Sequence, residues 1–255
     1  MNLLLSTDLC QHKSEEFHST TAKLLYLMKR ARPDLETTVS FLMRRVSKSD
    51  VQDWKKLLCC LGWLKRTKND NRVIGALSLS QVYTWINAAY AIHDNCHSHM
   101  GGAIFMGYGM IHAKSTIEKL NTKSSTEAEI VGVSEYVPYN IWLHMFLKAQ
   151  GYEIKNNIIY QDNMSVMLLA KNGRNSCTGN SRNINIWYFF VKDCIDKKEM
   201  KVEYCLTRLM LADFFTKPLC GKQFTLLREY IMGWKSTDEL IQNITNYKIK
   251  EGVEI

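Results

Sequence analysis

The spacing of apolar residues changes once along this chain, and the change limits what the chain can fold into. Over residues 14–66, apolar side chains recur every three or four positions, the period of an amphipathic helix. From Val82 the period becomes two, and two further short strands separated by glycines follow over residues 100–115. The pattern therefore predicts a helical segment, a boundary near residues 67–80, where polar residues mix with a glycine and short apolar pieces, and then a domain that contains a sheet.

The second part of the chain alternates predicted strands and helices. After the first three strands, we expect a long helix that Gly151 ends, followed by strand 156–162, helices 164–171 and 184–197, strand 200–206 and helix 209–216. Three strands that can form a meander, followed by strands connected through helices, predict an α/β fold with a mixed five-stranded sheet and flanking helices. Residues 234–255 are expected to form a polar, loosely held tail.

Basic side chains exceed acidic ones, and the excess lies in the first third of the chain. Lys and Arg total 33 against 25 Asp and Glu, which gives a net charge of +8. Two readings stay open for the helical segment: a helical bundle with a solvated basic face, or a surface that contacts nucleic acid. Under the second reading, the candidate binding residues, all expected to be exposed, are Arg30, Arg32, Arg44, Arg45, Lys55 and Lys56.

The cysteines indicate a reducing compartment. None of the eight forms a C-x-x-C pair, the opening residues are too short for the apolar core of a signal peptide, and no apolar run reaches membrane-spanning length. We therefore expect reduced cysteines in a cytoplasmic or nuclear protein that is neither secreted nor bound to a membrane.

Three acids, Glu129, Asp162 and Asp213, fall where the predicted strands and helices meet. Each has a structural reading: Glu129 fits a capping box with Thr126, Asp162 fits a helix cap, and Asp213 fits a solvated helix residue. Each also has a chemical reading, because carboxylates gathered over one face of a sheet favour Mg²⁺ or Mn²⁺, and two such ions can clamp a phosphodiester. Spacing alone leaves both readings open.

A metal-binding module is a different class of function, and the segment "HDNCHSHMGG" raises it. The segment contains His93, Cys96, His97 and His99. Structural zinc usually requires two ligand pairs at regular spacing, and the second pair is missing from the sequence. We therefore expect these residues to form a polar loop joining the first two strands.

Four segments in order resemble the ribonuclease H domain of copia-type LTR retrotransposon polyproteins: "LNTKSSTEAEIVGVSE", "YQDNMSVMLLAKNG", "NINIWYFFVKD" and "MLADFFTKPLCG". The upstream segment "AKLLYLMKRARPDLETTVSFL" resembles the last part of the same family's reverse transcriptase. The resemblance implies a helical thumb or connection remnant over residues 1–75, a ribonuclease H-like domain over residues 81–233 and the tail over residues 234–255. A larger polyprotein around the chain is an open expectation.

The resemblance also implies a chemistry. It makes Glu129, Asp162 and Asp213 catalytic, metal-binding carboxylates that hold two Mg²⁺ or Mn²⁺ ions and hydrolyse the RNA strand of an RNA–DNA hybrid. At the position of a fourth family acid stands Asn87, so we expect impaired cleavage. The alternative is an inactive, nucleic-acid-binding remnant of a transposable element. No polymerase activity is expected, because the chain has no Asp-Asp pair.

Overall fold

The computed structural model describes residues 8–172 and 182–251. The chain divides into two compact units, Met1–Arg72 and Val73–Ile255. No helix within these described ranges combines the length and apolarity that crossing a bilayer requires.

The first unit is helical, as the apolar period predicts. Its elements are α1 (Gln11–Arg30), the short 3-10 helix η1 (Pro33–Leu35), α2 (Glu36–Met43) and α3 (Val51–Arg66). Asp50 and Asp53 form a capping box that begins α3, since each side chain accepts a hydrogen bond from the other's backbone N–H. Phe17, Val39 and Leu57 are buried in the core where these helices pack together.

The second unit contains the expected mixed five-stranded sheet. Across the sheet, the strands are β5 (Met110–Ile117), β3 (His99–Phe105), β2 (Gln81–Ala89), β6 (Asn156–Gln161) and β7 (Lys201–Tyr204). β2, β3 and β5 pair antiparallel, whereas β6 and β7 continue the sheet parallel to β2. β1 (Gly75–Ala76) and β4 (Gly107–Tyr108) form a separate two-stranded sheet, with β4 in the connection between β3 and β5.

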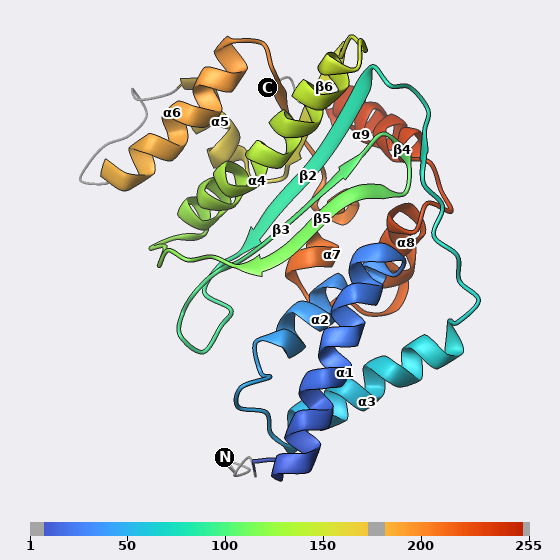
Figure 1. Ribbon diagram of the computed structural model, residues 1–255. Helices are drawn as coiled ribbons and strands as arrows, with labels where there is room; N and C mark the ends of the chain where they lie inside the picture. The colour runs from blue at the N-terminus through green and yellow to red at the C-terminus, as the bar shows by residue number, and fades with distance from the viewer. Residues whose placement is uncertain (1–7, 173–181, 252–255) are drawn as a thin grey trace. The chain divides into compact units, whose positions relative to one another are not determined.

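Helices cover both faces of the sheet (Figure 1). They are α4 (Ser125–Ala149), α5 (Met164–Asn172), α6 (Arg182–Asp196), α7 (Asp213–Thr216), α8 (Gly221–Ile231) and α9 (Thr237–Glu251). Alternate strand residues enter two cores: Trp85 packs with residues of α7, α8 and α9, whereas Ile86 packs with residues of α4 and α6. This alternation is the period of two that begins at Val82.

Two local expectations are wrong. The predicted helix 209–216 is instead the 3-10 helix η3 (Thr207–Leu209), followed by a short connection and the single turn α7. The expected polar tail contains α9, because Leu240 and Ile244 lie four residues apart on one helical face and are buried in the core. Polar residues dominate that segment, so its two buried apolar residues are not apparent from its composition.

Candidate functional site

Gly101 on β3 allows α7 to lie close to the centre of the sheet. It pairs in register with Asn87 on β2. A Cβ atom at position 101 would lie 2.7 Å from Cβ of Phe215 and 2.8 Å from Cγ2 of Thr216. Because glycine has no Cβ, the turn of α7 packs directly against the strand and brings Asp213 to Asn87.

Asp213 is buried and held on its Oδ1 atom by two donors. Nδ2 of Asn87 donates to Oδ1, and Nζ of Lys217 lies 2.8 Å from the same oxygen. Nδ2 of Asn87 also donates to Oγ1 of Thr216 at 3.3 Å. Burial raises the pKa of Asp213 above its ordinary value, Lys217 opposes the rise, and the charge of Asp162 adds to it. Asp213 is therefore not a solvated helix residue.

Glu129 approaches from the opposite face of the sheet, on α4. Its Oε2 accepts hydrogen bonds from the backbone N–H of Ala88 and from Nε2 of Gln161, each at 3.1 Å. Burial raises the pKa of Glu129 well above its ordinary value, and the neighbouring charge of Asp162 raises it further. The capping-box reading of Glu129 is wrong, because Ser124 caps α4 by accepting from the N–H of Glu127.

Asp162 directly follows β6 and is half-buried. It does not cap α5: Oδ1 of Asn163 accepts from the N–H groups of Ser165 and Val166, at 3.0 and 3.3 Å. Trp85 on β2 pairs with Tyr160 on β6, so Asp162 leaves β6 at the level of Asn87 on β2. The charge of Asp162 raises the pKa of both Glu129 and Asp213. The three acids thus gather at the carboxyl ends of β2 and β6, but they reach this point from both faces of the sheet rather than from one.

The side chains do not fit a pair of divalent cations as they lie. Asn87 directs its NH₂ group at Asp213, and an NH₂ group donates hydrogen bonds and cannot ligate a cation. Lys217 holds the same carboxylate oxygen. Over residues 8–172 and 182–251, no three His, Cys, Asp or Glu residues are grouped so that they could hold a metal ion. The assignment of Glu129, Asp162 and Asp213 as metal ligands stays a prediction from the resemblance.

The histidine-rich segment forms hydrogen bonds within the fold. His93 and His99 are buried and bond to each other through Nε2 and Nδ1 at 3.0 Å, and Nε2 of His99 bonds to Oγ of Ser115 at 2.8 Å. Nδ1 of His97 donates to the carbonyl oxygen of Glu118 at 2.8 Å. His99 uses both of its ring nitrogens in these bonds and is the first residue of β3, whereas His93 and His97 lie in the connection between β2 and β3.

The six candidate nucleic-acid-binding residues divide into two groups. Arg30, Arg44, Lys55 and Lys56 are exposed on the first unit, as expected. For Arg32 the expectation is wrong: it is buried, forms a two-pronged ion pair with Asp34 and bonds to Thr67. Arg45 is half-buried, and its Nε lies 2.7 Å from Oδ2 of Asp53. The guanidinium groups of Arg32 and Arg45 thus have partners within their own unit.

Three residues of the site were not singled out in the sequence. Gln161 orients Glu129, Thr216 accepts from Asn87, and Lys217 pairs with Asp213. Gln161 immediately precedes Asp162, whereas Thr216 and Lys217 belong to the segment "MLADFFTKPLCG" that carries the resemblance. The sequence signal that could have identified these three residues is therefore their closeness to the predicted acids.

The mixed five-stranded sheet with helices on both faces is the α/β architecture that the ribonuclease H resemblance predicts. No family model matches the chain. Its homologues are retrovirus-related Pol polyproteins from plant and yeast transposons, in agreement with the copia-type resemblance.

Three of these relatives illustrate the extent of the similarity. The retrovirus-related Pol polyprotein from transposon TNT 1-94 of Nicotiana tabacum is 27% identical over 239 residues, which are 90% of this chain and 18% of the relative. The transposon RE2 polyprotein of Arabidopsis thaliana is 25% identical over 82% of this chain and 14% of its own. The Ty1-DR5 Gag-Pol polyprotein of Saccharomyces cerevisiae is 27% identical over 64% of this chain and 9% of its own. The chain thus spans less than one fifth of each relative's length.

Two solved structures are also similar. Ribonuclease H1 from the archaeon Halobacterium salinarum has a TM-score of 0.35 at 9% identity, over 52% of this chain and 90% of that chain. The protease-reverse transcriptase of prototype foamy virus has a TM-score of 0.34 at 12% identity, over 63% of this chain and 21% of that chain.

Proposed function

We propose that this chain is a retrotransposon-derived ribonuclease H-like protein that binds RNA–DNA hybrids but cleaves them very poorly, and that it has no polymerase activity. The single observation that carries the proposal is the hydrogen bond from Nδ2 of Asn87 to Asp213. An acid at position 87 would add a full negative charge between Glu129 and Asp213, whereas the amide adds none.

The loss of that charge bears directly on catalysis. Two-metal hydrolysis of a phosphodiester depends on carboxylates that hold both ions beside the attacking and leaving oxygens. Preorganised electrostatics is usually the largest contribution, and removing one such group commonly lowers the rate by about 10²- to 10³-fold. With Mg²⁺ or Mn²⁺, we therefore expect slow turnover through Glu129, Asp162 and Asp213 at most.

Binding of the hybrid does not require the missing acid. Arg30, Arg44, Lys55 and Lys56 are exposed, and the net charge of +8 favours a polyanion. Binding through phosphates depends steeply on salt, because each contact releases counterions. A pure nucleic-acid-binding remnant without any turnover is the second candidate, and Asn87 favours it for the same reason.

Binding and cleavage of one labelled RNA–DNA hybrid by the full chain test the proposal and separate the candidates. We expect a complex whose affinity falls with salt, and product formation with Mg²⁺ or Mn²⁺ at the limit of detection. Strong cleavage by the unmodified chain would contradict the impaired site. Failure to bind the hybrid at low salt would contradict both candidates. Binding with no product in either metal would select the inactive remnant.

A further inference from the structure

Lys217 occupies an unusual position for a half-exposed lysine. It follows α7 directly, and its Nζ lies 2.8 Å from Oδ1 of Asp213, the oxygen that also accepts from Asn87. Its side chain is 43% exposed, whereas that of Asp213 is only 9% exposed. The ammonium group therefore lies on the solvent side of a buried carboxylate, at the open end of the acidic site.

The positive charge of Lys217 reaches more than one acid. It contacts Asp213 at 2.8 Å, at the end of β2 where Glu129 arrives from the other face of the sheet and accepts from the N–H of Ala88. Asp162 acts on both of these carboxylates with the opposite sign. One cation that offsets the mutual repulsion of carboxylates is the role that a divalent ion has in acid-only sites.

We propose that Lys217 is the internal counter-cation of this site, so that the fold of the second unit requires no divalent metal. Asn87 reduces the negative charge of the site, and Lys217 neutralises much of what remains. Metal dependence of folding is a property separate from hybrid binding or cleavage, and it can be measured without nucleic acid.

The alternative is that Lys217 and Asp213 form an ordinary ion pair of a short helix, with no relation to a metal. The chain provides a matched control in Asp193 on α6 and Lys197 directly after α6, which have the same order and spacing and an Nζ–Oδ2 distance of 2.6 Å. Both members of the control pair are more than half exposed. Such exposed pairs contribute little to stability. Lys197→Met therefore removes a comparable lysine without exposing a buried carboxylate.

The experiment measures thermal unfolding of the full chain in EDTA and in excess MgCl₂. Wild type and Lys197→Met should give the same Tm in both solutions. Lys217→Met should unfold about 3 °C or more lower in EDTA, because the buried Asp213 loses its cation, and MgCl₂ should recover most of that loss. Lys217→Arg keeps a cation at this position and should remain insensitive to MgCl₂.

A direct titration of the wild-type chain with Mn²⁺ keeps the proposal testable if Lys217→Met does not fold. Wild type should bind Mn²⁺ only weakly, without saturation at concentrations that fill ordinary carboxylate sites. Saturable, tight binding of Mn²⁺ by wild type would overturn the proposal, as would a wild-type Tm that rises with MgCl₂. It would also be overturned if Lys217→Met unfolds like Lys197→Met in EDTA and does not respond to MgCl₂.

Discussion

Asn87 on β2 donates a hydrogen bond to Asp213 at the start of α7, although 126 positions separate the two residues in the sequence. The bond joins the central strand of the sheet to the turn that covers one of its faces. It also places a neutral amide where a carboxylate would repel Asp213. The substitution is therefore compatible with a stable site and unfavourable for a site that must collect cations.

Asn87→Asp should restore cleavage of an RNA–DNA hybrid. An added carboxylate beside Asp213 and near Glu129 supplies the charge that two divalent ions require, and we expect a gain of about 10²- to 10³-fold in the single-turnover rate with Mg²⁺. The measurement is the rate of product formation from an end-labelled hybrid by wild type and Asn87→Asp.

Asp162→Asn serves as the control for that gain. Introduced into the Asn87→Asp chain, it should abolish the restored activity while leaving hybrid binding unchanged, because Asp162 directly follows β6 and its charge acts on both other acids. A wild-type chain that cleaves readily and does not respond to Asn87→Ala would show that position 87 has no part in the site.

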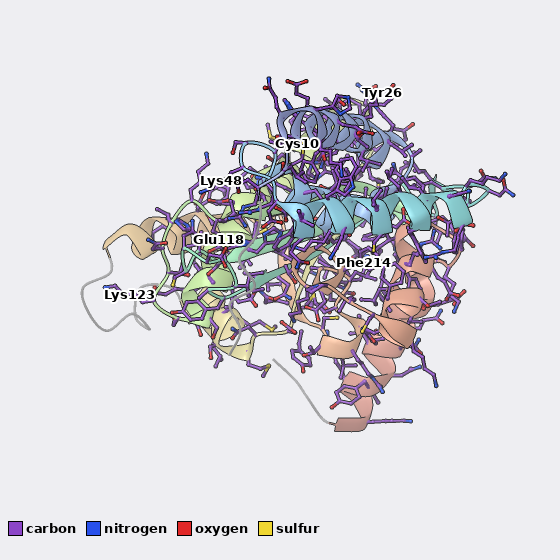
Figure 2. The ribbon with its side chains drawn as sticks, turned by 90° about the horizontal axis from the view of Figure 1, so that it is seen from below. Cys10, Tyr26, Lys48, Glu118, Lys123 and Phe214 are labelled. Carbon is purple, nitrogen blue, oxygen red and sulfur yellow. The ribbon has the colours of Figure 1, made fainter. Side chains whose placement is uncertain are left out.

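Glu118 should make the stability of the second unit depend on pH. Its side chain is fully buried, and neither carboxylate oxygen has a hydrogen-bond partner in the described part of the chain. Burial, with a smaller effect of Glu135, raises the pKa of Glu118 from 4.5 to about 8. Glu118 directly follows β5, at the start of the connection to α4. Figure 2 labels Glu118 and also Lys123, which lies near the α4 end of that connection.

The raised pKa fixes the sign of this effect. The unfolded chain ionises Glu118 above about pH 4.5, but the folded chain does so only near pH 8. The stabilisation present at low pH is therefore lost progressively as the pH rises from about 4.5 to about 8. Relative to Glu118→Gln, wild type should lose up to about 1.4 kcal/mol of unfolding free energy per pH unit in this window. Denaturant unfolding at several pH values measures it, with exposed Glu153→Gln as control. Parallel pH profiles for wild type and Glu118→Gln would contradict it.

Gly101→Ala should destabilise the fold and separate Asp213 from Asn87. The added methyl group would lie 2.9 Å from the carbonyl oxygen of Ala212 and closer to the side chains of α7, so the turn must move. Overpacking of this kind costs about 1–3 kcal/mol.

Gly62→Ala is the matched control for Gly101→Ala. Position 62 lies within α3 and has no atom within 4 Å of an added Cβ, so alanine there should stabilise the helix by about 0.5–1 kcal/mol. Thermal unfolding followed by circular dichroism distinguishes the two variants. Equal Tm values for Gly101→Ala and wild type would show that the turn has room at this strand.

Arg32→Ala should lower the stability of the first unit rather than act directly on nucleic-acid binding. It removes both hydrogen bonds of the guanidinium group to buried Asp34, and breaking such a pair costs about 3 kcal/mol or more. Exposed Arg44→Ala should change stability by no more than about 0.5 kcal/mol. If Arg44 contacts a phosphate, that variant should instead lower the salt dependence of hybrid binding by about one unit. A large loss of stability in Arg44→Ala, with only a change in salt dependence in Arg32→Ala, would contradict the division of the basic residues into paired and exposed ones.

The sequence alone determined the features that depend on neighbouring residues and on recognisable segments. The period of two from Val82 predicts the strand that becomes the centre of the sheet, because side chains of a strand alternate between its faces. The helical period over residues 14–66 predicts the helices of the first unit. The resemblance predicted Asn87, Glu129, Asp162 and Asp213 as site residues, and the fold places these four at the same end of the sheet.

Only the tertiary structure decided which polar groups meet. The burial of Arg32 depends on Thr67, 35 residues away, and the role of Lys217 depends on acids from two faces of the sheet. Leu240 and Ile244 are core residues because the sheet presents an apolar face to α9. A charge or hydroxyl group has the same identity wherever the chain places it, but its environment is set by partners distant in sequence. Those partners, more than the residue itself, determine whether a lysine is a solvated side chain or the cation of a buried site.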